Sequence, residues 1–347
     1  MKYYAINGSP FANKITGIER YMYETLRRVD KIINTECAEI YLLCPENVKL
    51  TMPDFTNIKI IYLRHKRGKV KISEIHKFLK TKNAVYCTMS GNLCIQKGAV
   101  VCTHDIRPWI YKQYDPFMFR VKCRLNFLSS KFFSGKMVTV SETSKKEISR
   151  YLSVKPEKIE VIPNGWEHME EIAEDMTFWD RHPEIRKGEY YYSLSSQAPH
   201  KNFKWIVENA KRHPENTYIV AGKVWDIMKN DSARGRNIVY LGYVSDGESK
   251  TLMKNCKGFI HPSKYEGFGI TPLEALSCGA TLYVSKASCL PEIFNGVASF
   301  FDPDDYDFSF ESNSTITKEE REKTLVKYSW DRAAEKWCFL FEGGVNG

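Results

Sequence analysis

The chain has 347 residues, which at roughly 150 residues per domain predicts two domains. Hydrophobic residues make up 43% and charged residues 27% of it, which excludes a disordered, collagen-like or fibrous protein. The net charge of +9 is uneven, because residues 1–163 contain 29 Lys and Arg against 14 Asp and Glu, whereas residues 164–347 contain 22 against 28. We therefore expect the first domain to face an anionic partner.

Short β-rich runs alternate with helical stretches along the first domain, which is predicted to span residues 1–165. The expected strands are KYYAI, EIYLLC, IKIIYL, AVYCT, AVVCT, MVTV and IEVI. The expected helices are residues 17–33, 70–81, 116–133 and 142–153. This alternation is typical of a doubly wound parallel sheet.

A second alternation follows a polar, acidic stretch, residues 166–188, which we interpret as an interdomain connection. The second domain, residues 189–328, has the strands YYYSL, TYIVA, NIVYL, GFIHP, ATLYV and VASFF. Its expected helices are residues 201–212, 246–255, 271–278 and 290–294. The final helix, residues 329–347, is expected to pack back towards the first domain. The predicted fold class is α/β, with two Rossmann-like domains facing a central cleft where ligands bind at the carboxyl ends of the strands.

The stretch SKYEGFGITPLEAL, residues 263–276, is the most informative one for function. Gly267 and Gly269 would let the backbone approach a ligand closely. Thr271, Pro272 and Glu274 fit the N-cap, N1 and N3 positions of a helix. A free helix N-terminus attracts a diphosphate, so this stretch is the predicted ligand site of the second domain.

A purely structural role accounts for one of the two carboxylates in this stretch better than for the other. Thr271 and Glu274 also fit a capping box, so a structural task for Glu274 is as well supported as a functional one. Glu266 lies between an aromatic residue and a glycine turn, where no structural task is evident. We therefore favour a functional role for Glu266, such as accepting hydrogen bonds from sugar or ribose hydroxyls.

The spacing of these two glutamates resembles a known family. Glu266 and Glu274 enclose seven residues, as in the E-x7-E signature of retaining glycosyltransferase family 4, which has the GT-B fold and includes bacterial enzymes of surface-polysaccharide synthesis. Further stretches resemble this family in the same order along the chain: TGIERY (16–21), THD (103–105), VSETS (140–144), VIPNG (161–165), PHKN (199–202), LGYVS (241–245) and YSW (328–330). The resemblance therefore extends over nearly the whole chain.

The resemblance implies roles for residues of the second domain. Glu266 would hold hydroxyls of the donor sugar, Glu274 would hold the ribose, and Lys201 would supply a positive charge for the diphosphate. The rest of the donor site would comprise Gly267, Phe268, Gly269, Ile270 and Thr271. The family often has an arginine near this lysine, whereas Gln197 and His200 are found here, so a second phosphate-binding cation is not assigned.

The resemblance also implies two sites in the first domain. Gly17, at a predicted helix start, would direct its amide at the β-phosphate of the donor, although a helix-start glycine without a ligand is an even alternative. His104, just after the strand AVVC, would lie near the reacting sugar carbon and help orient the acceptor together with Asp105. The alternatives are a histidine that bonds a loop and an aspartate that only orients the ring.

No pattern in the sequence indicates a metal or a cofactor. Asp302, Asp304 and Asp305 follow a strand in a proline turn, where local hydrogen bonds explain them. The eight histidines and ten cysteines show no zinc spacing, and neither a G-x-S-x-G elbow nor a G-x-G-x-x-G fingerprint is found. We therefore expect the reaction to be independent of metals.

Two basic stretches of the first domain interleave cations with apolar residues. Residues 64–71 lead into Ile72, Ile75, Phe78 and Leu79, and a second such stretch spans residues 111–136. Both are interpreted as contacts with an anionic membrane surface rather than with nucleic acid, since the second domain is acidic. An amphipathic helix packed on its own sheet is nearly as well supported.

Location is predicted from the first residues and the cysteines. MKYYAINGSPF lacks the apolar core of a signal peptide, and no window approaches about 18 uninterrupted apolar residues. The cysteines form no C-x-x-C pair and lie mostly in apolar runs, as expected for reduced thiols. We therefore expect a cytoplasmic protein, peripheral on the cytoplasmic face of the membrane.

Together these observations predict a retaining, metal-independent glycosyltransferase. It would move a hexose or deoxyhexose from a nucleoside diphosphate sugar to a carbohydrate acceptor, expected to be a lipid-linked oligosaccharide in polysaccharide biosynthesis. The expected catalytic residues are Glu266, His104 and Lys201. A sugar-nucleotide epimerase or hydrolase on the same fold, and a non-catalytic protein that binds nucleotide sugars or glycans, stay as alternatives.

Overall fold

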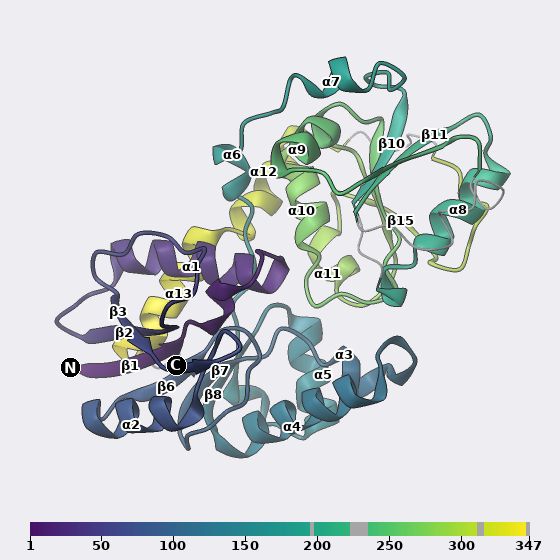
Figure 1. Cartoon of the computed structure of the whole chain (residues 1–347). Helices are drawn as coiled ribbons and strands as arrows, with labels where there is room; N and C mark the ends of the chain where they lie inside the picture. The colour runs from purple at the N-terminus through teal and green to yellow at the C-terminus, as the bar shows by residue number, and fades with distance from the viewer. Residues whose placement is uncertain (195–197, 223–234, 311–315, 345–347) are drawn as a thin grey trace. The chain divides into compact units, whose positions relative to one another are not determined.

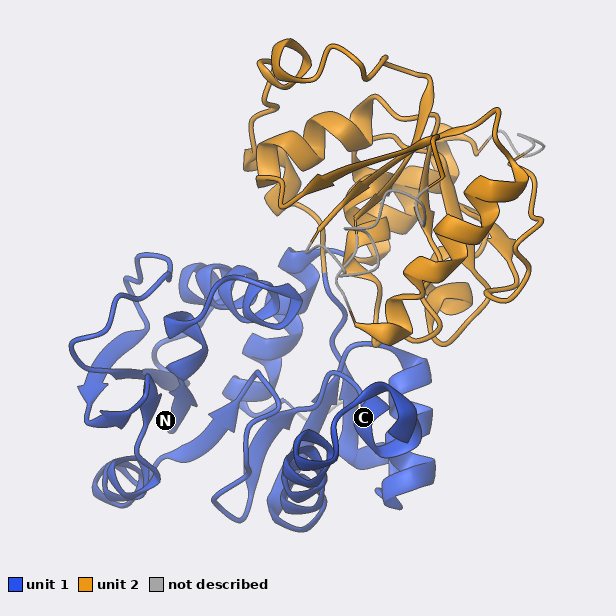
Figure 2. Cartoon of the chain, turned by 45° about the vertical axis from the view of Figure 1, so that its right-hand side comes forward, with its two compact units in different colours: residues 1–164, 329–347 blue, residues 165–328 orange. Residues whose placement is uncertain are grey.

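The computed structural model describes residues 1–194, 198–222, 235–310 and 316–344. It divides into two compact units, shown in different colours in Figure 2. Unit 1 contains residues 1–164 together with residues 329–347, and unit 2 contains residues 165–328. Each unit is built on its own parallel sheet.

The sheet of unit 1 has seven described strands in the order β3-β2-β1-β6-β7-β8-β9. They are β1 (Lys2–Asn7), β2 (Ala38–Pro45), β3 (Lys59–Leu63), β6 (Val85–Thr88), β7 (Ala99–Cys102), β8 (Ser134–Thr139) and β9 (Ile159–Val161). Strand β7 is buried along its whole length, as expected for a parallel strand covered on both faces. The strand order reverses between β1 and β6, which makes this a doubly wound sheet.

Helices cover both faces of this sheet. They are α1 (Gly17–Ile32), α2 (Ile72–Lys82), α3 (Arg107–Ile110), α4 (Phe117–Phe133), α5 (Glu142–Leu152) and α13 (Trp330–Glu342). Helices α1 and α13 lie side by side although they come from opposite ends of the chain (Figure 1). The indole of Trp337 donates to the hydroxyl of Tyr21 at 2.9 Å, and Arg28 pairs with Asp331 at 2.7 Å. The end of the chain therefore completes unit 1.

The basic stretch at residues 64–71 forms a hairpin. Strands β4 (His65–Lys66) and β5 (Lys69–Val70) pair antiparallel, and the two residues between them, Arg67 and Gly68, have φ of 53° and 74°. Two consecutive left-handed residues form the tight turn whose twist suits a two-residue hairpin. The cations of this stretch therefore extend on a hairpin rather than along a helix.

Helix α2 corrects part of the membrane prediction. Ile75 and Leu79 are only 1% and 4% exposed, and Phe78 is partly buried against the same core. Ile72 is exposed, but it is alone at the start of the helix. The interfacial interpretation of this segment was wrong, because its apolar face packs on its own sheet.

The sheet of unit 2 has six described strands in the order β12-β11-β10-β13-β14-β15. They are β10 (Tyr190–Leu194), β11 (Thr217–Ala221), β12 (Ile238–Gly242), β13 (Gly258–His261), β14 (Leu282–Ser285) and β15 (Ser299–Phe301). The helices are α6 (His168–Glu171), α7 (Phe178–Arg181), α8 (Phe203–Arg212), α9 (Asp246–Lys254), α10 (Ile270–Ser277), α11 (Leu290–Phe294) and α12 (Lys318–Lys327). The order reverses between β10 and β13, so the predicted pair of Rossmann-like domains is confirmed.

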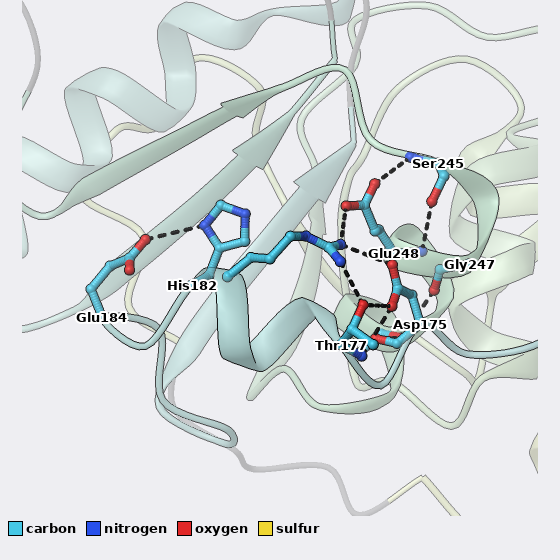
Figure 3. Close-up of polar contacts among 9 residues, drawn as sticks. Asp175, Thr177, His182, Glu184, Ser245, Gly247 and Glu248 are labelled. Atoms are coloured by element: carbon cyan, nitrogen blue, oxygen red, sulfur yellow. Dashed lines mark hydrogen bonds and ion pairs between the residues drawn. The ribbon is translucent and has the colours of Figure 1, made fainter.

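The predicted connection, residues 166–188, packs within unit 2 against helix α9. Arg181 pairs with Asp175 at 2.8 Å and with Glu248 at 2.6 Å. Glu248 also forms a capping box with Ser245 at the start of α9. Figure 3 shows how Asp175, Glu248 and Ser245 gather at this helix start. These contacts attach the segment to α9.

Candidate functional site

The candidate site of unit 2 lies at the carboxyl ends of β10 and β13, where the strand order reverses. The 3-10 helix η4 (Pro199–Lys201) comes after β10, and residues 262–269 follow β13. The amide of Lys264 donates to the carbonyl of His200 at 2.7 Å, which joins the two loops. Ligands of doubly wound folds bind at this position, because the loops diverge there and leave a crevice.

The structure brings Lys201 and Glu266 into direct contact in these loops. The Lys201 amine lies 2.7 Å from Oε1 and 2.9 Å from Oε2 of Glu266. His261, the last residue of β13, shares the same carboxylate, with Nε2 2.9 Å from Oε1. The Lys201 and Glu266 side chains are 24% and 11% exposed. Two residues that the sequence singled out separately therefore form one charged cluster.

The electrostatics of this cluster favour the ionised carboxylate. Burial alone would raise the pKa of Glu266, but the ammonium of Lys201 and the hydrogen bond from His261 outweigh it and hold that pKa well below its usual range. The backbone carbonyl of Glu266 also accepts a hydrogen bond from the Ser288 hydroxyl at 2.7 Å. The site thus presents a fixed negative carboxylate beside a fixed ammonium.

Sequence reasoning missed His261, although a signal was present. This histidine ends the apolar strand GFIHP, so it had to lie at the carboxyl edge of the sheet, five residues before Glu266. A second missed residue, His168 in α6, donates from Nε2 to Oε1 of Glu274 at 2.9 Å. Nothing in the sequence links His168 to a residue so distant along the chain.

The expected start of helix α10 was wrong. The N-cap is Gly269, and the structure describes no side-chain capping bond there, so neither Thr271 as N-cap nor Glu274 as N3 is correct. Gly269 takes the left-handed conformation, with φ of 92°, and the helix begins directly after it at Ile270. The structure therefore excludes the capping-box role of Glu274. Its carboxylate instead accepts a hydrogen bond from His168.

The remaining predicted donor residues differ in what they leave available to a ligand. A Cβ on Gly269 would lie 2.8 Å from Cδ2 of Leu290, and its φ is 92°, so packing and backbone conformation explain this glycine without a ligand. Phe268 is 3% exposed and its ring contacts Tyr328 edge-on, which leaves only its backbone for a ligand.

The amides at the start of α10 are the other donors near Glu266. Gly267 precedes the helix and Ile270 is its first residue. Among the described residues, no acceptor is seen for the amides of Ile270 and Thr271. Such amides, with the positive end of the helix dipole, favour an anion. Gln197, which is found where the family often has a second phosphate-binding cation, lies outside the described residues.

Two of the predicted residues of unit 1, His104 and Asp105, line one pocket of about 1250 Å³, whereas Gly17 is not part of its lining. Its walls come from the carboxyl ends of β1, β6 and β7, from the β4–β5 hairpin and from α4. His104 lines this pocket, and its Nε2 lies 2.8 Å from the carbonyl of Met89. Burial lowers the pKa of His104, so the ring is neutral near pH 7, and Nε2 is then the donor to Met89. His104 therefore bonds a loop and leaves Nδ1 as an acceptor.

Asp105 has a structural task in this unit, whereas the role of Gly17 stays a prediction. Asp105 lines the pocket, and its Oδ1 accepts from the amide of Arg107 at 2.9 Å. The ring of His104 bonds Met89 rather than Asp105 among the described contacts, so orienting the ring is not the role of Asp105. Gly17 is the first residue of α1, as expected.

Metal-binding and membrane-spanning features were searched over the described residues. No group of three or more His, Cys, Asp or Glu is placed to hold a metal ion there. Asp302 accepts from the amide of Asp304 at 2.8 Å, which is the expected local turn. In the described part of the chain, every helix is too short or too polar to cross a bilayer.

Comparison with known proteins bears on the site in unit 2. Residues 175–329 match the family model described as glycosyl transferases group 1. This stretch contains the Lys201–Glu266 pair, and the predicted relationship to glycosyltransferases is confirmed for it. Assignment to family 4 and the role of its E-x7-E signature stay predictions.

Two of the curated relatives are named as O-antigen enzymes. The chain is 28% identical to the O-antigen chain mannosyltransferase RfbU of Salmonella typhimurium, over 63% of this chain and 61% of the relative. It is also 28% identical to the O-antigen chain mannosyltransferase B of Escherichia coli, over 60% of this chain and 58% of the relative. The chain thus spans about three fifths of the length of these two relatives.

Solved structures share the fold over nearly the whole chain. Sucrose-phosphate synthase from Thermosynechococcus elongatus has a TM-score of 0.74 at 12% identity and covers 98% of both chains. HepE of Anabaena, solved in complex with UDP, has a TM-score of 0.69 at 13% identity and covers 98% of this chain and 99% of its own. WaaG, a glycosyltransferase involved in lipopolysaccharide biosynthesis, has a TM-score of 0.63 at 14% identity and covers 99% of this chain and all of its own. These likenesses confirm the predicted GT-B fold.

Proposed function

We propose that this chain is a glycosyltransferase that moves a hexose or deoxyhexose from a nucleoside diphosphate sugar to a carbohydrate acceptor in bacterial surface-polysaccharide synthesis. The Lys201–Glu266 pair carries this proposal, because it lies at the switch point of the sheet in the unit that matches a glycosyltransferase family. Two relatives are named O-antigen chain mannosyltransferases, so mannose is the first sugar to test.

The proposed chemistry uses the charges of the unit 2 site. Lys201 and the amides that begin α10 stabilise the departing diphosphate, where negative charge develops in the transition state. Glu266 accepts hydrogen bonds from the donor sugar, and Glu274 accepts them from the ribose. Lys201 is expected to move from Glu266 towards the diphosphate when the donor binds. This arrangement requires no metal.

The proposed stereochemical outcome is retention. Glu266 is expected to keep its hydrogen bond with His261 and to hold hydroxyls of the donor sugar, so we assign it no role as a covalent nucleophile. Attack from the face of the leaving group is then expected, with the departing phosphate accepting the proton of the acceptor hydroxyl. In unit 1, His104 would accept a hydrogen bond through Nδ1 and so orient the acceptor.

We propose that α4 is the part of the chain that contacts an anionic membrane surface. This helix has no Asp or Glu along its 17 residues, and it carries Arg120, Lys122, Arg124 and Lys131. Its exposed apolar side chains include Phe117 at 67%, Met118 at 72%, Leu125 at 58% and Phe132 at 66% exposure. Positions 117, 118, 125 and 132 share one face of a helix. An apolar face flanked by cations suits the interface of an anionic leaflet.

Thermal stability in the presence of nucleotides tests the donor site. UDP, GDP and dTDP and their sugars are each added with and without EDTA, and a ligand at 100 times its Kd stabilises by about 2.7 kcal/mol. A selective shift that EDTA leaves unchanged supports the proposal, and transfer to an acceptor glycan then separates it from donor hydrolysis or epimerisation. The absence of any shift would contradict a nucleotide-sugar site.

A further inference from the structure

The pocket of unit 1 is lined by an unusual excess of cations. Those without a described carboxylate partner are Lys66, Arg67, Lys69, Lys71 and Lys122. The two acids of the lining are already engaged, because Glu19 accepts from Asn13 and Thr16, and Asp105 accepts from the Arg107 amide. The lining therefore carries more positive than negative charge, and neither of its two acids forms a described ion pair with these five cations.

The hairpin that carries four of these cations is held in place. Ser9 accepts a hydrogen bond from the amide of Val70 at 3.0 Å, and the amide of Gly68 donates to Nδ1 of His65 at 3.0 Å. Arg67 takes the left-handed conformation, where asparagine or glycine would be less strained. A strained, fixed turn with an arginine at its tip is typical of a functional position.

Lys69 and Lys122 line the same pocket from two different elements of its wall. Lys69 lies in β5 and Lys122 in α4, and both are exposed to the pocket. The charge of Lys122 is the largest cause that lowers the pKa of Lys69, followed by burial. Two like charges on the wall of one pocket, neither with a described carboxylate partner, favour a multiply charged anion there.

We infer that this pocket binds the phosphate or diphosphate group of the acceptor, between Lys69 and Lys122. The inference rests on the proposed function, and it specifies the class of acceptor. The same pocket has exposed apolar side chains at Ile18, Leu93 and Phe119, which offer contacts to an organic chain attached to that phosphate. A lipid and a sugar are the two sources of such an anion, and both share the phosphate chemistry.

Isothermal titration of the full chain with inorganic pyrophosphate and with geranyl diphosphate tests the inference. The double variant Lys69→Ala/Lys122→Ala is expected to bind both probes at least tenfold more weakly than the parent. Lys77→Ala/Lys80→Ala is the matched control, because these lysines of α2 are exposed, lie outside the pocket and carry the same charge. Lys69→Arg/Lys122→Arg keeps the charge and should retain binding.

The titrations are repeated in the Lys201→Ala chain, so that the diphosphate site of unit 2 contributes little. Binding that persists there and is lost on removal of Lys69 and Lys122 belongs to the pocket. Stronger binding of geranyl diphosphate than of pyrophosphate indicates a lipid-borne group, whereas equal binding indicates a phosphate recognised by itself.

Equal affinities of the pocket variant and the control variant would overturn the inference. Its failure is distinguishable from failure of the proposed function, because nucleotide stabilisation measured in the Lys69→Ala/Lys122→Ala chain reports on unit 2 alone. A parent that no nucleotide stabilises, but that binds pyrophosphate through Lys69 and Lys122, would refute the donor site and keep the anion site.

Discussion

The amine of Lys201 and the carboxylate of Glu266 form an ion pair at 2.7 Å although 64 residues separate them in the sequence. The two side chains come from loops that follow adjacent parallel strands. Their contact depends on β10 and β13 being neighbours in the sheet, which the linear order of the strands alone does not require.

Lys201→Ala should lower kcat for glycosyl transfer by about 100-fold, the scale expected when one charge-stabilising donor is removed. The reason is the loss of the ammonium that stabilises the departing diphosphate. Lys204→Ala is the matched control, because Lys204 is exposed in the first turn of α8 and has no contact with Glu266. Steady-state kinetics with saturating donor measure the effect, and equal kcat values for the two variants would exclude Lys201 from the site.

Glu266→Gln should destabilise unit 2 at pH 7 by about 3 kcal/mol, because Lys201 and His261 lose the charge that compensates them. The lowered pKa of Glu266 means that the parent's extra stability is present above about pH 4.3, the usual glutamate pKa, and is lost as the pH falls below it. The difference between parent and variant should therefore shrink in acid. Urea unfolding at pH 7 and at about pH 2 measures it, and a constant difference would argue against the charged pair.

Gly269→Ala should cost about 2 to 3 kcal/mol of unfolding free energy, since it combines backbone strain with overpacking against Leu290. Gly188→Ala separates the two causes. Gly188 also has a positive φ, 75°, but no heavy atom lies within 4 Å of its added Cβ. This control should therefore cost only about 1 kcal/mol. If urea unfolding gives equal losses, packing against α11 does not constrain Gly269.

Phe117→Ser/Phe132→Ser should weaken binding to vesicles that contain an anionic lipid by about tenfold or more, because two apolar side chains no longer enter the bilayer. Ile32→Ser/Tyr62→Ser is the control, since these residues of unit 1 are 50% and 56% exposed away from α4. Sedimentation with anionic and neutral vesicles measures binding. Equal sedimentation of parent, variant and control would place the membrane contact elsewhere.

The sequence was sufficient for the fold class, because two series of alternating strands and helices predict two doubly wound sheets. It also indicated Glu266, because a carboxylate at the carboxyl end of a strand has no packing task there. Periodicity and turn chemistry are local properties, so they can be read along the chain.

Only the tertiary structure decided which side chains meet. His261 and His168 bond the two glutamates through strand neighbours and loops that local patterns do not specify. Likewise, α2 and α4 have similar mixtures of cations and apolar residues, yet α2 buries Ile75 and Leu79 whereas α4 exposes Phe117 and Phe132. The pattern shows that an apolar face exists, but what covers it depends on packing between segments far apart in the sequence.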